Sequence, residues 1–218
     1  ANYDLGSVYA SKGDIERAMR QFSSVISLDP GYAPAYFNLG VMSARKGELN
    51  KAREYLSAAL KLNPDDAESH CSLGVVLMNQ GEVNEAMAHF KEALRIDPSS
   101  PAARNYLVAA SSYSKKMDEG LAMLEQKRLK EPDNTKLLQK LAVIYSSRGE
   151  NAKALEALYR LVKIQPGNPD GYYNIACVFA KQGKVDESLE WLHKAISQGF
   201  KDWNLLRKDK DLDNLRNT

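Results

Sequence analysis

The side chains with the most reactive or metal-binding chemistry are three histidines and two cysteines, His70, His89, His193, Cys71 and Cys177. Imidazoles and thiolates bind transition metals when several converge, and a thiolate beside a histidine can act as a nucleophile. No cysteine or carboxylate stands at metal-ligand spacing around the three histidines, so we expect no metal site. No histidine can be placed beside Cys177, which we expect to be an inert thiol.

The remaining sequence offers no other recognisable catalytic motif. The glycines form neither a phosphate-binding loop, nor a nucleophile elbow, nor a dinucleotide fingerprint. We therefore expect no cofactor and no enzymatic activity. Both cysteines are predicted to stay free thiols, which suits a reducing compartment and favours the cytoplasm. An extracytoplasmic domain of a membrane protein is the alternative.

Charge and hydropathy exclude two classes of partner. The chain has 30 basic and 28 acidic residues, a formal net charge of +2. Nucleic-acid binders depend on neutralising phosphates, so this balance disfavours nucleic acid. No apolar run reaches the roughly 18 residues of a membrane span, so we expect no direct membrane insertion by this segment. The chain starts without Met and partway into a repeat, which suggests a piece of a longer protein.

The elements that must position these residues recur with a 34-residue period. Five apolar, helix-like stretches each end in a polar residue followed by proline, at Pro30, Pro64, Pro98, Pro132 and Pro166. Proline cannot continue a helix and biases the preceding residue out of the α region. Each period therefore predicts two short helices, and the six predicted repeats are residues 1–32, 33–66, 67–100, 101–134, 135–168 and 169–202.

Small and large residues alternate in fixed columns of these repeats. A turn column between the two helices favours positive φ and holds Gly13, Gly47, Gly81, Lys115, Gly149 and Gly183. In the first helix a large apolar residue precedes a small one, as in Leu39 and Gly40. In the second, a small residue precedes a large one by four positions, as in Ala52 and Leu56. Such pairs lie on one helical face and predict close helix packing.

Together these columns resemble the tetratricopeptide repeat. The stretch "YFNLG" with Ala52, Leu56 and Pro64, and "SLG" with Ala86, Phe90 and Pro98, match the pattern L-G-x2-Y, A-x3-F and P. The resemblance extends to about residue 200. It implies an all-α fold, a right-handed superhelical solenoid of antiparallel helix pairs. It also implies that the first helix of each repeat lines a concave groove.

The array is predicted to end at "SQGFKDW", residues 197–203. Gly199 suits the end of the last helix, and terminal repeats need a cap over their apolar face. Residues 203–218 are predicted to form one or two capping helices, and the apolar residues from Gly199 onward include Phe200, Trp203, Leu206, Leu212 and Leu215. Trp203 as a partner anchor is the alternative. This ending resembles that of many bacterial arrays and favours a bacterial source.

The groove implied by the resemblance is lined by aromatic, amide and small side chains with little net charge. The candidate binding residues are Tyr3, Phe37, Asn38, Val41, Arg45, Cys71, Asn79, Asn105, Tyr106, Tyr113, Lys136, Gln139, Lys140, Tyr173, Asn174 and Lys181. Amides can pair with a peptide backbone and aromatics can pack on its side chains. In relatives, a Lys, Asn and Arg constellation clamps a terminal carboxylate. Lys136 and Lys140 match part of it, but Cys71, Val75 and Tyr106 do not.

The fourth repeat departs from the others. It has Val108 in place of a small residue, Lys115 in place of the turn glycine, and Gly120 in place of alanine. One hypothesis makes this repeat a flexible point that divides the array, with "KRLK", Lys136 and Lys140 forming a basic patch for an acidic partner. Sequence drift in a tolerant array is the alternative.

Three functions remain open at this stage. The first is a non-catalytic scaffold that binds a peptide or partner domain in the concave groove. The second is an accessory domain that recruits substrate for a larger enzyme, such as a glycosyltransferase. The third is a self-assembling array, a homo-oligomer formed through an open N-terminal face that leaves Leu5 and Val8 exposed.

Overall fold

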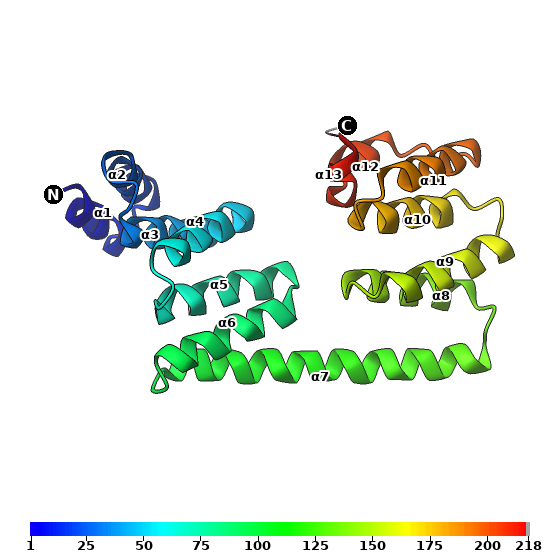
Figure 1. Ribbon diagram of the computed structural model, residues 1–218, viewed down its shortest axis with the longest axis horizontal. Helices are drawn as coiled ribbons and strands as arrows, with labels where there is room; N and C mark the ends of the chain where they lie inside the picture. The colour runs from blue at the N-terminus through cyan, green and yellow to red at the C-terminus, as the bar shows by residue number, and fades with distance from the viewer. Residues whose placement is uncertain (217–218) are drawn as a thin grey trace. The chain divides into compact units, whose positions relative to one another are not determined.

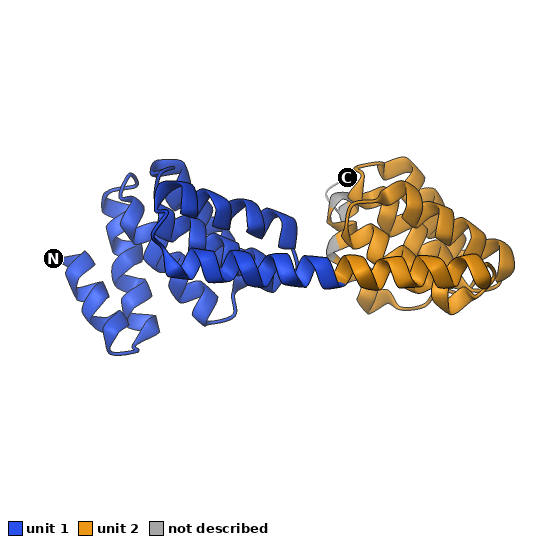
Figure 2. Ribbon diagram, turned by 90° about the horizontal axis from the view of Figure 1, so that it is seen from below, with its two compact units in different colours: residues 1–116 blue, residues 117–218 orange. Residues whose placement is uncertain are grey.

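The computed structural model describes residues 1–216, and every regular element among them is helical. The chain divides into two compact units, residues 1–116 (unit 1) and residues 117–218 (unit 2), which Figure 2 shows in different colours. Among the described residues, no helix is long and apolar enough to cross a membrane.

Unit 1 consists of three helix pairs and the first part of a long helix (Figure 1). The pairs are α1 (Asn2–Ser11) with α2 (Ile15–Leu28), α3 (Ala33–Arg45) with α4 (Leu49–Leu62), and α5 (Ala67–Gln80) with α6 (Val83–Ile96). The long helix is α7 (Pro101–Lys130).

Unit 2 begins with the end of α7 and continues with two helix pairs and a C-terminal segment. The pairs are α8 (Thr135–Ser147) with α9 (Asn151–Ile164), and α10 (Pro169–Lys181) with α11 (Val185–Ser197). The segment contains α12 (Trp203–Lys208), a 3-10 turn η1 (Lys210–Leu212) and α13 (Asp213–Arg216).

Helix ends follow the chemistry expected from the sequence. Side chains of Asp14, Asp66, Asn134 and Asn168 accept hydrogen bonds from backbone N–H groups at helix N-termini. The five glycines of the turn column have φ between 72° and 84°, as predicted for the connection within each helix pair. The local sequence therefore sets where these helices begin and end.

The small and large columns produce close helix packing within each pair. A Cβ added at Gly74 would lie 2.5 Å from the Phe90 ring, and one at Gly40 would lie 2.6 Å from Leu56 Cγ. Both large side chains have no exposed surface. Because a real Cβ cannot approach so closely, glycine is needed at these two positions for the helices to meet.

The two helices expected in residues 101–134 are instead one continuous helix, α7. Lys115 stands where other repeats have a positive-φ glycine, and no non-glycine residue has positive φ among the described residues. A side chain makes the left-handed conformation costly, so the helix continues through the expected turn. Between Ala110 and Leu121, no residue of α7 is buried. The proposed flexible point at this repeat stays a prediction.

The expected basic patch at "KRLK" is partly neutralised by acidic neighbours. Arg128 Nη1 lies 3.3 Å from Glu156 Oε1, and Lys127 Nζ lies 4.0 Å from Glu131 Oε1. These ion pairs are largely exposed, so they contribute little to stability. They do reduce the positive charge available to an acidic partner.

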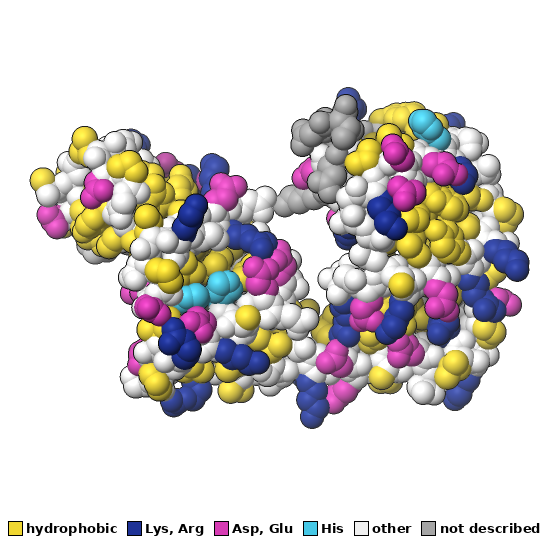
Figure 3. Space-filling view, viewed as in Figure 1, with side chains coloured by type: hydrophobic (Ala, Val, Ile, Leu, Met, Phe, Trp, Pro, Cys, Tyr) yellow, Lys and Arg dark blue, Asp and Glu magenta, His cyan; other side chains and the backbone are white. Residues whose placement is uncertain are grey.

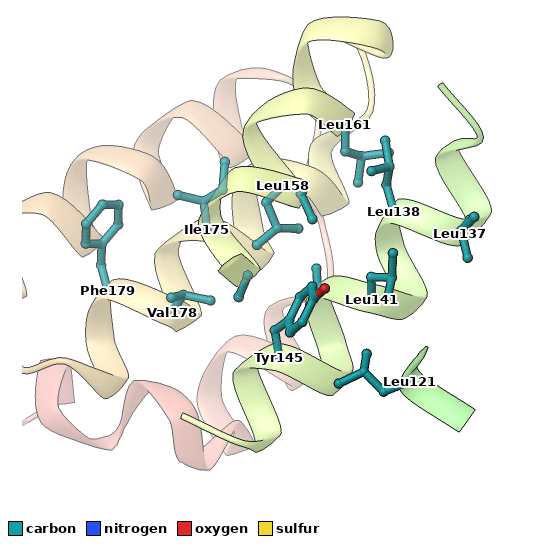
Figure 4. Close-up of a cluster of buried hydrophobic side chains, with 13 residues drawn as sticks. Leu121, Leu137, Leu138, Leu141, Tyr145, Leu158, Leu161, Ile175, Val178 and Phe179 are labelled. Atoms are coloured by element: carbon teal, nitrogen blue, oxygen red, sulfur yellow. The ribbon is translucent and has the colours of Figure 1, made fainter. Parts of the chain in front are cut away.

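The core of unit 2 is built from α7, α8, α9 and α10, as Figure 4 shows. Leu121 from α7 packs with Leu141 and Tyr145 from α8, while Leu158 and Ile175 join from α9 and α10. Unit 1 has corresponding clusters around Phe22 and around Phe90.

Candidate functional site

In unit 1, consecutive first helices bring Tyr3 and Asn38 together. Asn38 Nδ2 donates to the Tyr3 hydroxyl over 3.1 Å and to the Pro34 carbonyl over 2.9 Å. Both amide hydrogens are thereby engaged within the chain, so a partner N–H would have to donate to Asn38 Oδ1. Tyr3 is half-buried and packs against Phe22 and Tyr32, with ring centroids 5.6 and 5.3 Å away.

The other candidate residues of unit 1 differ in exposure. Phe37, Val41 and Cys71 are half-buried and pack against the hydrophobic clusters. Burial and the Glu68 carboxylate raise the pKa of the Cys71 thiol, so it stays protonated near neutral pH. The candidates that remain exposed are Arg45, Asn79, Asn105, Tyr106 and Tyr113. A partner on the first helices of unit 1 would therefore meet mainly aromatic and amide groups.

In unit 2, a cavity of about 180 Å³ opens between α8, α10 and the C-terminal segment. Its lining includes Val143, Ser146 and Ser147 from α8 and Tyr173, Asn174 and Lys181 from α10. Three candidate residues predicted from the sequence thus share one cavity. The candidates Lys136, Gln139 and Lys140 lie on α8 but are not among the lining residues.

The C-terminal segment, residues 200–216, covers part of this face. Phe200 stacks on Tyr173 with 4.5 Å between ring centroids and 7° between planes, and the Tyr173 hydroxyl donates to Asp209 Oδ2 over 2.5 Å. Leu212 is only 2% exposed and packs in the same cluster. The sequence places Tyr173 on an open groove, whereas its side chain is 4% exposed beneath the chain's own segment.

Cys177, Asp209 and Asp211 bring potential metal-ligand atoms within 4.8 Å of one another. Burial, and then the Asp209 charge, raise the pKa of the Cys177 thiol to about 12, so it is protonated near neutral pH. Asp209 accepts from Tyr173, and Lys181 Nζ lies 2.9 Å from Asp211 Oδ2. A metal ion would have to displace these partners. The three side chains therefore serve better to hold the C-terminal segment on α10 than to bind a metal ion.

Both cysteines are free. Trp203, the alternative partner anchor, is 52% exposed in α12, and a role for it stays a prediction. Leu5 and Val8 on α1 are 42% and 46% exposed, so α1 presents apolar side chains to its surroundings.

Sequence reasoning missed side-chain pairs that lie 19 residues apart within one helix pair. His70 and His89 have ring centroids 5.1 Å apart, and Tyr172 and Trp191 have centroids 6.0 Å apart. Tyr159 adds a third ring at 5.5 Å from Trp191. Figure 3 shows hydrophobic side chains gathered over α9, α10 and α11 of unit 2. The sequence contains a signal for these contacts. Positions four and twenty-three of these two repeats hold side chains of the same kind, His70 with His89 and Tyr172 with Trp191.

In three repeats, the side chain at position four also reaches the carbonyl of the proline near the end of the preceding repeat. The Tyr172 hydroxyl donates to the Pro166 carbonyl, and the Arg104 guanidinium donates to the Pro98 carbonyl, both over 2.9 Å. The donor therefore varies in chemistry while the acceptor is always the same backbone group. We call these contacts the proline junctions.

The proline junction at His70 determines which ring nitrogens carry hydrogen. His70 Nε2 lies 3.0 Å from the Pro64 carbonyl, which can only accept, so Nε2 carries the hydrogen. In the neutral ring, His70 Nδ1 is then an acceptor. His89 Nδ1 lies 2.9 Å from it and is therefore the donor of this hydrogen bond.

We expect unit 1 to lose stability as the pH falls below about 6.5, the ordinary pKa of histidine. Burial, His70 and Arg53 lower the pKa of His89, so the unfolded chain binds a proton more readily than the folded chain. Stability from this group is present above the unfolded pKa and is lost as pH falls through the folded value. Urea unfolding at pH 7.5 and 5.5 measures it. His89→Gln should reduce the pH dependence and His193→Gln, an exposed control, should not; equal dependence in all three proteins would contradict the assignment.

Comparison with known families identifies the family to which the chain belongs. Residues 1–212 match the family described as the C-terminal domain of cilia and flagella-associated protein 70, a tetratricopeptide-repeat family. The chain belongs to this family. The resemblance to tetratricopeptide repeats and the all-α fold of helix pairs predicted from the sequence are thereby confirmed. A search of curated proteins finds no match.

Several solved structures are similar in fold. The first tetratricopeptide domain of Spaghetti (RPAP3) bound to the HSP90 peptide SRMEEVD is 18% identical, with 52% of this chain and 90% of that chain covered and a TM-score of 0.51. A tetratricopeptide repeat protein from Parabacteroides merdae is 18% identical, with 99% and 83% covered and a TM-score of 0.50. The Arabidopsis OM64 tetratricopeptide domain is 16% identical, with 51% and 93% covered and a TM-score of 0.50. At these identities, the likeness concerns the fold. A bacterial source for this chain stays a prediction.

Proposed function

We propose that this domain is a non-catalytic protein-interaction scaffold that binds a peptide or partner segment on the face of its first helices. One observation carries the proposal. In unit 2, the first helix α10 already holds a segment of polypeptide through stacking, a hydrogen bond and an ion pair. The similar Spaghetti (RPAP3) domain is bound to an HSP90 peptide, which is consistent with such a use of this fold.

The chemistry of the face supports a peptide ligand. Hydroxyl, amide and ammonium groups line the cavity beside the exposed Val143 of α8 and the buried Val178 of α10, and the cavity gives access to an incoming chain. Polar groups on such a surface fix the register of a peptide, while apolar groups supply contact area. The unmatched Lys and Asn positions argue against recognition of a free terminal carboxylate.

Site-specific photo-crosslinking tests where partners bind. A photoreactive phenylalanine analogue placed at Tyr113 or Val143, exposed residues of first-helix faces, should capture proteins from a ciliary extract. The same analogue at Tyr159 or Leu189, exposed residues of second helices, is the matched control. Capture mainly from first-helix positions is the expected result.

Two other outcomes would redirect the assignment. Equal capture from second-helix positions would move binding away from the first-helix face. Cross-links between two copies of the chain would support the self-assembling alternative instead.

A further inference from the structure

Residues 209–212 of the C-terminal segment meet unit 2 in a regular way. Asp209 accepts from the Tyr173 hydroxyl, and its Oδ2 also lies 3.9 Å from the Cys177 sulfur. Asp211 pairs with Lys181 at 2.9 Å, and Leu212 is buried in the cluster beneath. Asp209 and Asp211 thus have different partners on helix α10, and Leu212 packs in a cluster to which α10 and α11 both contribute.

The backbone of this stretch holds the three side chains in one direction. The Asp211 N–H donates to Asp209 Oδ1 over 3.0 Å, and the Leu212 N–H donates to the Asp209 carbonyl over 3.1 Å. These two bonds form a compact turn in which the first, third and fourth residues contact α10. With the second position left open, the sequence pattern of the contacting residues is Asp-X-Asp-Leu.

The groups on α10 call for a hydrogen-bond acceptor at the first place and a negative charge at the third. Burial and the bond to Asp209 raise the pKa of the Tyr173 hydroxyl well above its usual value, so it remains a donor and calls for an acceptor. Lys181 Nζ is also 3.3 Å from Ser146 Oγ on α8, which directs the ammonium toward the carboxylate. Both carboxylates belong to side chains, so recognition does not need a free chain end.

We propose, on the basis of the interaction function above, that this face of unit 2 binds partner peptides with an Asp-X-Asp-Leu sequence. Residues 209–212 of the chain itself then act as an intramolecular occupant that a partner must displace. We call this surface the α10 docking face, defined by Tyr173, Cys177 and Lys181.

Two features of the C-terminal segment would ease its displacement from α10 by a partner peptide. The Lys181–Asp211 pair is about one third exposed on each side chain, and exposed ion pairs are weak. Helix α12, which leads into the occupant, has no buried residue, and its Trp203 and Leu205 are 52% and 41% exposed. Leu206 and Leu215 also pack, partly buried, against the cluster that holds Phe200 and Leu212, so apolar contacts supplement the two aspartates.

A labelled peptide tests the proposal. The probe is KDKDLDNLR, the sequence of residues 208–216, carrying fluorescein and an amidated C-terminus. Fluorescence anisotropy measures its binding to the whole chain and to the Asp211→Lys chain, whose occupant is repelled by Lys181. We expect at least about tenfold tighter binding to the Asp211→Lys chain than to the unmodified chain.

A charge exchange then identifies the contact. The double variant Lys181→Glu with Asp211→Lys exchanges the two charges and restores an ion pair within the chain. The chain's own segment should then return to α10, and peptide binding should fall by about tenfold or more. The single variant Lys181→Glu should bind the probe that carries Asp211→Lys in preference to the original probe. Lys181→Ala provides a second variant, and circular dichroism verifies that each chain is folded.

Three results would overturn the proposal. They are equal probe affinity for the unmodified and Asp211→Lys chains, loss of preference for the exchanged probe with Lys181→Glu, and a concentration-dependent dimer that exchanges segments between copies. If the probe fails while photo-crosslinking still locates partners on first helices, the Asp-X-Asp-Leu assignment falls and the scaffold function stands. If crosslinking alone fails, the scaffold function falls and peptide binding remains a property of the isolated face.

Discussion

Phe90→Ala is expected to lower the free energy of unfolding of unit 1 by about 3–5 kcal/mol, the usual range for removal of a buried aromatic side chain. The Phe90 side chain has no exposed surface and fills the space left by Gly74. Tyr106 stacks on its outer side, with 5.5 Å between ring centroids. Neither neighbour can fill the resulting cavity without moving a helix. Urea denaturation followed by circular dichroism measures the change.

A second substitution separates tight packing from general damage. Gly74→Ala alone should cost about 1–3 kcal/mol, because its Cβ would lie 2.5 Å from the Phe90 ring. In the Phe90→Ala background, the same methyl group enters empty space, so its cost should largely disappear. Additive effects of the two substitutions would show that the glycine column serves another purpose.

Gly120→Pro is expected to cost about 3 kcal/mol and to reduce the helical circular dichroism signal, because proline removes a hydrogen bond inside helix α7. Gly120 lies ten residues before the helix end at Lys130 and is exposed. The matched variant Gly120→Ala should stabilise the helix by about 1 kcal/mol, since an added Cβ meets no atom within 4 Å.

These two variants also decide between a continuous helix and a flexible point. If residues 115–120 formed a turn in solution, proline would cost little and alanine would bring no gain. Hydrogen exchange in residues 115–130 provides an independent measurement, and exchange no faster than in α6 or α9 would argue against the flexible point.

Much of the fold could be predicted because its determinants are local. Turn glycines such as Gly81 and the close approach of Gly74 to Phe90 follow directly from residue size and backbone preference. The same backbone preferences explain why residues 101–130 differ, because the Cβ of Lys115 disfavours the positive-φ turn found in the other repeats. The 34-residue period predicts two helices in this segment, but Lys115 in place of glycine removes the turn that would separate them.

The candidate site was harder to predict because it depends on contacts between distant segments. Apolar spacing in residues 200–215 indicates that a cap exists, but it does not specify the helix on which Leu212 and Asp209 settle. The sequence alone therefore places Tyr173 on an open surface. The pairing of His70 with His89 depends on two repeat positions in different helices, and neither position alone predicts the contact.

The proline junctions have a consequence for engineering the array. Each uses a fixed backbone acceptor, while its donor is an imidazole, a guanidinium or a phenol. A library that randomises one residue per junction among hydrogen-bond donors should therefore retain the fold while it varies surface chemistry. The repeats that have a proline junction could accordingly be varied or exchanged one at a time, because the backbone acceptor that receives the new side chain stays the same.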